Sequence, residues 1–252
     1  MQRRGVAVTF PRSVEPLADV RRVLVVCAHP DDVDFAAAGT VAHWVDEGLG
    51  VGYLVVTRGD AGGFDDTPRE RMPQLREAEQ RAAAKAVGVE RVEFLDGYRD
   101  GMLTPSLDLR RDITRAIRRY RPDRILTNSP LRRWDRIAGP GHPDHLAVGE
   151  ATTCAIYPDA RNPFAFPELA GDEGLTPWVV REVWYHGGPN PDHVVDITDT
   201  YPRKLAALAA HATQTSHEDV EARLRPMLEL NARTAGLPPG RLAEAFTVLR
   251  TG

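Results

Sequence analysis

Apolar runs alternate with helical patterns along most of the chain. Residues 23–28 (VLVVCA) form an unbroken apolar run, which is typical of a strand buried on both faces. After a short polar turn, Phe35, Ala38 and Ala42 recur at helical spacing, and Gly48 ends that helix. Because strands and helices continue to alternate, the pattern predicts a mostly parallel sheet with helices on both faces.

The other elements follow from the same two periodicities. The predicted strands span residues 23–28, 51–57, 91–95, 124–127, 179–186 and 193–197. The predicted helices after the first span residues 73–87, 107–120, 145–156, 200–211 and 217–230, and a short helix ends the tail 236–246. The polar stretch 131–141 and the proline-rich stretch 157–177 are predicted loops. The fold class is therefore α/β, with a doubly wound sheet in the strand order 3-2-1-4-5 and a C-terminal strand and helix extension.

Length and composition are those of one globular domain. The chain has 252 residues, of which 42% are hydrophobic and 27% charged, so it can bury a substantial core. We expect a single domain over residues 1–252, with the core at about 20–160 and the extension at 161–252 packing on it.

Charge and hydropathy exclude several classes of partner. The net charge of −4 gives no general attraction to nucleic acid or to an anionic membrane. No apolar run approaches the roughly 18 residues that a spanning helix needs, and the first 16 residues lack the apolar core of a secretory signal. Two cysteines form no disulfide framework, and Cys27 is predicted to be a core residue. A cytoplasmic protein is expected, and a homo-oligomer remains an open alternative to a monomer.

Two pairs of ligand-type side chains follow predicted strands. His29 and Asp32 come directly after the first strand, and His142 and His145 lie in the loop after the fourth. Hydrolytic zinc commonly takes three His or carboxylate ligands and leaves one position for water, so neither pair suffices alone. Because the first and fourth strands are neighbours in the expected order, both pairs should open into one crevice at the carboxyl edge of the sheet.

Other interpretations of these pairs exist. A His-Pro-Asp sequence is often only a turn, and Asp32 could simply cap the following helix. The scaffold could also bind a nucleotide. However, the first turn lacks both the GxGxxG and the Walker A patterns, and it offers carboxylates where a phosphate needs amides. The pattern therefore favours a metal site.

The sequence AHPDD at 28–32, together with GHPDH at 141–145, resembles the PIG-L/LmbE family of zinc-dependent N-acetylglucosaminyl deacetylases. The resemblance covers about residues 20–160 and implies a Rossmann-like fold. It also implies Zn²⁺ as the cofactor, with Fe²⁺ or another divalent ion as the alternative, and a small N-acetylated amino sugar or its conjugate as the partner. The family motif usually continues with Glu, whereas here Val33 and Asp34 follow.

The resemblance assigns the metal and the base. His29, Asp32 and His145 match the metal ligands of the family, and Asp31 matches the general base. Asp31 is adjacent to a ligand, yet its carboxylate is free to take a proton from water.

The resemblance also assigns the groups around the substrate. His142 matches the residue that stabilises the tetrahedral intermediate, and Asp144 matches the acid that tunes it. A carboxylate beside His142 would raise the pKa of the imidazole and keep it protonated. Arg76, Asp60 and Asp100 match positions that bind the substrate.

The leading hypothesis is a metal-dependent hydrolase that removes acetyl from an N-acetylglucosamine-type sugar. A second hypothesis is an amidase that cleaves a larger thiol–sugar conjugate. A third is a non-catalytic metal- or sugar-binding protein, which the intact Asp31 and His142 argue against, because a pure binding site needs no base.

Overall fold

The computed structural model describes residues 14–64 and 66–252. Within those residues, seven strands form one sheet in the order β3-β2-β1-β4-β5-β7-β6. The strands are β1 (Arg22–Cys27), β2 (Gly50–Val55), β3 (Arg91–Phe94), β4 (Arg124–Asn128), β5 (Glu182–His186), β6 (His193–Asp196) and β7 (Ala243–Arg250). The first five strands are parallel, which confirms the predicted 3-2-1-4-5 core and the α/β class.

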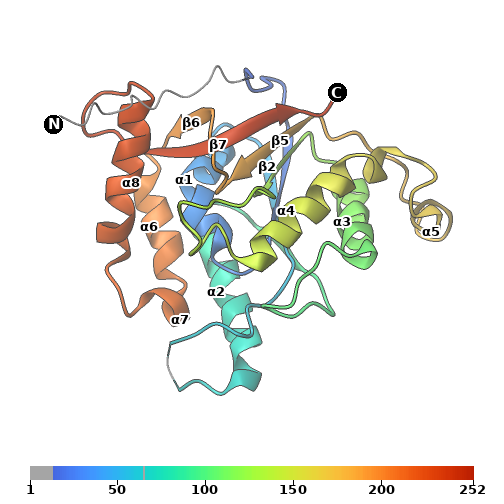
Figure 1. The fold of residues 1–252 in the computed structure, drawn as a ribbon, viewed down its shortest axis with the longest axis horizontal. Helices are drawn as coiled ribbons and strands as arrows, with labels where there is room; N and C mark the ends of the chain where they lie inside the picture. Colours follow the sequence, from blue (N-terminus) through green and yellow to red (C-terminus); the bar gives the residue numbers. More distant parts are fainter. Residues whose placement is uncertain (1–13, 65) are drawn as a thin grey trace.

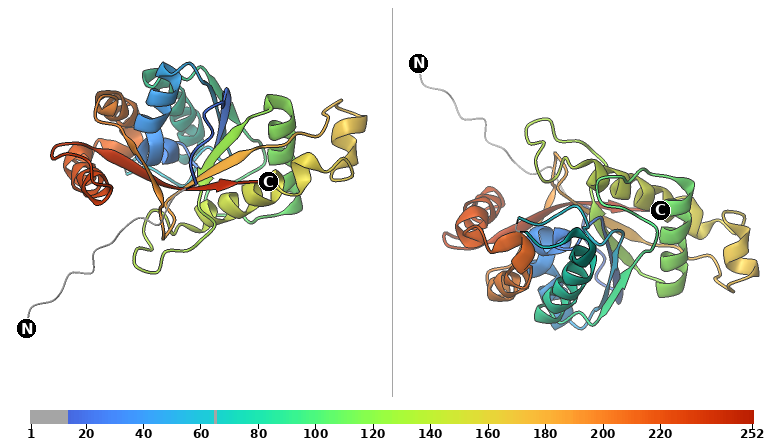
Figure 2. Two further views of the ribbon diagram at one scale, coloured as in Figure 1. Left: turned by 90° about the horizontal axis from the view of Figure 1, so that it is seen from above. Right: turned by 90° about the horizontal axis from the view of Figure 1, so that it is seen from below.

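Helices cover both faces of this sheet (Figures 1 and 2). They are α1 (Asp32–Asp46), α2 (Met72–Ala86), α3 (Leu107–Tyr120), α4 (Pro143–Ile156), α5 (Pro167–Gly171), α6 (Tyr201–Ala209), α7 (Ala212–Thr215) and α8 (Val220–Thr234). Alternation along β1 explains the two layers. Val23, Val25 and Cys27 pack toward α1 and α2, whereas Leu24 and Val26 pack toward α3 and α4.

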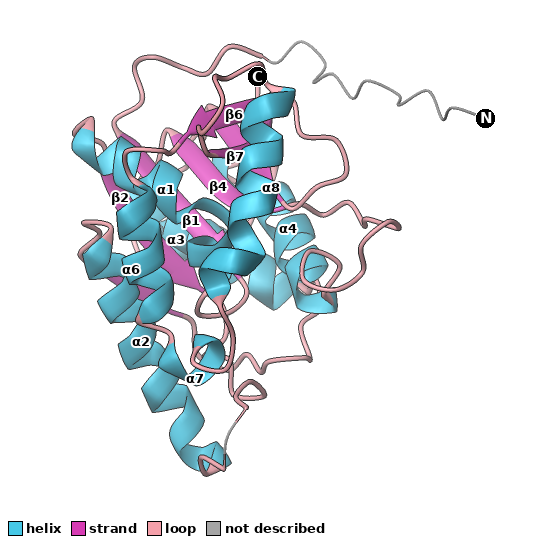
Figure 3. Ribbon diagram, turned by 90° about the vertical axis from the view of Figure 1, so that its left-hand side faces the viewer, coloured by secondary structure: helices cyan, strands magenta, loops and turns pink. Residues whose placement is uncertain are grey.

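The C-terminal extension continues the same sheet. Strand β7 pairs antiparallel with both β5 and β6, α8 packs beside it, and α6 packs against α1 and α2 (Figure 3). The predicted short helix at the end of 236–246 is therefore wrong. Ala and Glu favour a helix locally, but Phe246 and Val248 alternate into the core, and the pairing of β7 with a strand on each side overrides that preference.

Other boundaries shift by a few residues. Strand β5 begins at Glu182 instead of 179, and α4 begins at Pro143, because a proline suits the first turn of a helix. The stretch 157–177 is not entirely loop, since it contains the short helix α5. The division of the chain near residue 160 stays a prediction.

No helix among the described residues is long and apolar enough to cross a membrane. The expectation that the chain lacks a secretory signal depends largely on residues 1–13, which lie outside the described residues. The cytoplasmic location stays a prediction. Cys27 is fully buried, as expected for a core residue.

Candidate active site

The turn after β1 and the turn before α4 meet at the carboxyl edge of the sheet. Strands β1 and β4 pair directly, so the loops that follow them open side by side. The structure brings together His29, His142 and His145, and one ring nitrogen of each lies within 4.8 Å of the others. Nε2 of His145 also lies 2.8 Å from Oδ1 of Asp32. The two sequence pairs thus form one cluster.

Asp32 is held inside this cluster by the backbone. The amides of Ala28 and His29 both donate to its Oδ2, at 3.0 and 2.9 Å. The carboxylate therefore accepts hydrogen bonds from the two backbone amides that follow β1. It does not cap α1, which was the alternative interpretation of this residue. Burial raises the pKa of Asp32, but His145 and His29 more than offset burial and hold the pKa well below its usual value. Asp32 is thus an anion.

His29 is oriented by two further carboxylates. Its Nε2 lies 3.0 Å from Oδ2 of Asp144 and 3.0 Å from Oδ1 of Asp100. Burial lowers the pKa of His29, but Asp32, Asp100 and Asp144 outweigh burial and raise the pKa well above its usual value. With Nε2 engaged, the other nitrogen, Nδ1, lies on the side of Asp32, 3.6 Å from Oδ2.

The carboxylate of Asp144 contacts a different histidine from the one that the sequence suggested. Its carboxylate accepts from the amides of Gly101 and Leu103, at 2.7 and 3.1 Å, and contacts His29 rather than His142. Asp144 raises the pKa of His142, as expected, but the expected net rise is wrong. Burial, together with the neighbouring His29 and His145, lowers the pKa of His142, and the opposing effect of Asp144 is smaller.

His142 has a defined hydrogen bond. It is the N-cap of α4, and its Nδ1 accepts the backbone N–H of Asp144 at 3.2 Å. An accepting Nδ1 carries no proton, so in the neutral ring the proton resides on Nε2.

Asp31 has a strained backbone conformation, and Arg76 holds it through hydrogen bonds. Its φ of 87° lies in the left-handed region, which is rare for a residue with a side chain. Nη2 of Arg76 donates to Oδ2 of Asp31 at 2.9 Å and to the carbonyl of Pro30 at 2.6 Å. Burial raises the pKa of Asp31 to about 6, and Arg76 opposes that rise.

Arg76 itself is only 3% exposed, so it offers little surface to a substrate. Its Nη1 donates to the carbonyl of Gly59, and a Cβ at Gly59 would lie 2.1 Å from that nitrogen. Glycine is required there because the loop backbone packs directly against the guanidinium. The structure favours a role for Arg76 in placing Asp31, and its predicted contact with substrate stays a prediction.

Asp60 and Asp100 lie in two loops that bridge to each other. The amide of Asp100 donates to Oδ1 of Asp60 at 3.0 Å, and the amide of Ala61 donates to Oδ2 of Asp100 at 3.2 Å. Asp100 contacts the histidine cluster through His29, whereas Asp60 stabilises the loop of Asp100 through a hydrogen bond to its backbone. Their substrate contacts stay predictions.

Three buried residues behind Asp31 escaped the sequence reasoning. Gln80 accepts the amide of Asp31, Asp34 accepts from Gln80, and His211 pairs with Asp34. His211 is fully buried. Gln80 carried one weak signal, since it lies one helical turn after Arg76 on the same face of α2.

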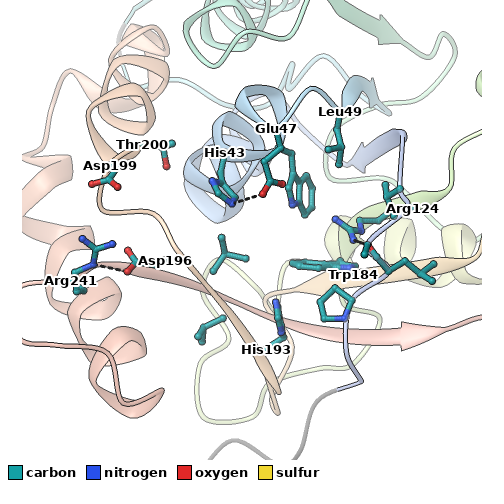
Figure 4. Close-up of a pocket in the computed structure, with 17 residues that line it drawn as sticks. His43, Glu47, Leu49, Arg124, Trp184, His193, Asp196, Asp199, Thr200 and Arg241 are labelled. Atoms are coloured by element: carbon teal, nitrogen blue, oxygen red, sulfur yellow. Dashed lines mark hydrogen bonds and ion pairs between the residues drawn. The ribbon is translucent and has the colours of Figure 1, made fainter.

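A separate cavity of about 700 Å³ lies at the opposite edge of the sheet, lined by α1, β6 and residues 16–20 (Figure 4). Its polar groups largely pair with one another, as in His43 with Glu47 and Arg241 with Asp196. In the part of the chain that the structure describes, two groups of three side chains could hold a metal ion. Both contain His29, so both lie in the histidine cluster and not in this cavity.

Imidazoles and carboxylates that converge at the carboxyl edge of an α/β sheet fit the site of a metal-dependent hydrolase. The family model for GlcNAc-PI de-N-acetylase, PIG-L, matches residues 24–156. The chain therefore belongs to the PIG-L family, as the sequence resemblance indicated.

Individual relatives agree with this assignment. The chain is 31% identical to a diacetylchitobiose deacetylase of Thermococcus kodakarensis, over 91% of this chain and 81% of that protein. It is 30% identical to a 1D-myo-inositol 2-acetamido-2-deoxy-alpha-D-glucopyranoside deacetylase of Rhodococcus erythropolis, over 79% of this chain and 83% of that protein. The solved N,N'-diacetylchitobiose deacetylase of Pyrococcus horikoshii superposes with a TM-score of 0.82 at 28% identity, covering 92% of this chain and 84% of that one.

Proposed function

We propose that this protein is a metal-dependent hydrolase that removes the N-acetyl group from an N-acetylglucosamine unit of a small sugar or sugar conjugate. One observation carries the proposal: His29, His142 and His145, from two distant turns, place ring nitrogens within 4.8 Å of one another beside Asp32. The similarity to deacetylases of diacetylchitobiose and of a glucosaminyl inositol supports an N-acetylated amino sugar as the substrate class.

The donor set fits a divalent ion. His29, Asp32 and His145 would hold it, and we propose Zn²⁺, although imidazole nitrogen and carboxylate oxygen also suit Fe²⁺. The contacts of His29 with Asp100 and Asp144 match the usual support of a metal-bound histidine, whose other ring nitrogen meets a carboxylate. When bound, the ion supplies Lewis acidity, which lowers the pKa of water and polarises a carbonyl.

Asp31 is the proposed general base. It accepts a proton from the attacking water and can return that proton to the leaving amine nitrogen. A pKa of about 6 suits both steps near neutral pH, because the group is mostly ionised and its conjugate acid is still able to donate. Arg76 fixes the direction of the carboxylate through its hydrogen bond to Oδ2.

His142 is the proposed stabiliser of the oxyanion. Since Nδ1 accepts from the backbone, Nε2–H is free to donate to the acetamide oxygen as it gains negative charge. This role requires a donor but no full positive charge, so the lowered pKa of His142 is compatible with it. Loss of one such donor costs about 10²–10³ in rate.

The test is release of acetate from a panel of substrates. Zinc-loaded protein is incubated with N-acetylglucosamine, N,N'-diacetylchitobiose and an N-acetylglucosaminyl inositol, with and without chelator. We expect acetate from at least one of them, abolished by chelator and restored by zinc. Cleavage of a thiol–sugar conjugate without acetate from these sugars would favour the amidase, and bound metal without any hydrolysis would favour the binding protein.

A further inference from the structure

One peptide group in the site is clamped at both of its ends. The carbonyl of Pro30 accepts from Nη2 of Arg76 at 2.6 Å, and the N–H of Asp31 donates to Oε1 of Gln80 at 2.8 Å. The orientation of the peptide between Pro30 and Asp31 sets the φ of Asp31, which is 87°. Arg76 and Gln80 lie one turn apart on α2, so a single helix face holds the strained turn.

Gln80 is itself held in one orientation. Its Nε2 donates to Oδ2 of Asp34 at 2.8 Å, which leaves only its oxygen to face the amide of Asp31. The same Oδ2 lies 2.8 Å from Nε2 of His211, the residue that precedes α7 in the C-terminal extension. Gln80, Asp34 and His211 are all 0% exposed, so no solvent competes for these bonds.

We propose that Gln80 is a positioning residue for Asp31, oriented by Asp34 and His211. Through the series of hydrogen bonds from His211 to the amide of Asp31, the C-terminal extension holds the turn that carries the base. This inference rests on the proposed function, in which Asp31 takes the proton from water. Gln80 touches neither the histidine cluster nor the carboxylate of Asp31, so it acts only through the backbone.

The first variant is Gln80→Met, which keeps the length of the side chain and removes both hydrogen bonds. Freed from the clamp, the peptide can rotate toward an ordinary φ and carry the carboxylate of Asp31 away from the attacking water. We expect kcat to fall about 10- to 100-fold, as for other residues that support reacting groups, with KM within about twofold and bound zinc unchanged. Gln74→Met is the matched control, because Gln74 is exposed on the same helix.

The second variant tests the orientation directly. In Gln80→Glu, an oxygen replaces the donor that faces Asp34, and two carboxylates oppose each other. Adding Asp34→Asn puts an NH2 group in the place of Oδ2. Its two hydrogens can reach the new carboxylate and Nε2 of His211, which accepts when the imidazole carries its proton on Nδ1. We expect the double variant Gln80→Glu/Asp34→Asn to recover at least tenfold in kcat over Gln80→Glu alone, the non-additivity typical of residues in contact.

The outcomes separate the two proposals. If the wild-type protein releases no acetate from any of the three sugars tested above, the proposed function fails. If the wild type is active and Gln80→Met keeps its kcat, or loses kcat only in proportion to its bound zinc, the positioning role of Gln80 is overturned. Should Gln80→Met fail to fold, the paired Gln80→Glu and Asp34→Asn variants decide, and a double variant no better than Gln80→Glu overturns the inference.

Discussion

Lys204 offers a sharp test of how the C-terminal extension supports the catalytic turn. This lysine is 0% exposed, and its Nζ donates to the carbonyls of Asp34 and Phe35 in the first turn of α1, both at 2.8 Å. It also donates to Oε1 of Glu244 in β7 at 2.7 Å. The change to make is Lys204→Met, which keeps the length of the side chain and removes its charge.

The expected loss in the free energy of unfolding follows from the buried carboxylate that the substitution leaves without its cation. Glu244 is 1% exposed and would lose its cation, although the amide and hydroxyl of Thr40 would still donate to it at 2.8 and 2.6 Å. Removing one partner of a buried ion pair costs about 3–5 kcal/mol, and the retained bonds place this case near 3 kcal/mol. For a chain of this length, that loss lowers Tm by roughly 6–12 °C.

Urea unfolding followed by circular dichroism, with thermal scans in parallel, measures the free energy of unfolding. The matched control is the double variant Lys204→Met/Glu244→Gln, which removes the stranded carboxylate and keeps an acceptor for Thr40. It should recover half or more of the loss. A cost below about 1 kcal/mol for Lys204→Met, or a double variant as unstable as the sum of its parts, would refute the reasoning.

Three further predictions concern the site and His186, the last residue of β5. Asp31→Ala should keep bound zinc and lose activity, whereas His29→Ala should lose both; metal content and acetate release distinguish them, and turnover in Asp31→Ala would remove the assignment of the base. His142→Ala should keep its zinc but lose about 10²–10³ in kcat, and loss of the metal instead would make His142 a ligand. Burial lowers the pKa of His186 to about 4 from an ordinary value of 6.5, so the native state resists protonation where the unfolded chain accepts it. The contribution of neutral His186 to stability is complete above pH 6.5 and is lost as the pH falls toward 4. Between pH 7.5 and 4.5, the free energy of unfolding of the wild type should therefore fall by about 2–3 kcal/mol more than that of His186→Met, as measured by urea titration. Equal losses in the two proteins would contradict this.

The sheet and the meeting of the two turns were accessible from the sequence for a physical reason. Buried parallel strands have unbroken apolar runs, and the doubly wound order makes β1 and β4 neighbours, so His29 and His145 had to approach each other. Local pattern and topology agree there, and no distant contact is needed to decide.

Elsewhere a distant contact decides. The strand β7 pairs with β5 on one side and β6 on the other, and the residues AEAF alone do not predict this pairing. The contact of Asp144 with His29, and not with His142, depends on the loop amides of Gly101 and Leu103, which turn its carboxylate. Gln80 is one polar residue on a helix, and only the strained turn opposite it gives that residue a role.

The most direct measurement is a zinc titration of metal-free protein, with the rate of acetate release from each of the three sugars of the panel followed at each addition. A site closed by His29, Asp32 and His145 predicts a rate that rises from near zero and levels off at about one zinc per chain. Full activity in the metal-free protein, or none after one equivalent has bound, would contradict the account.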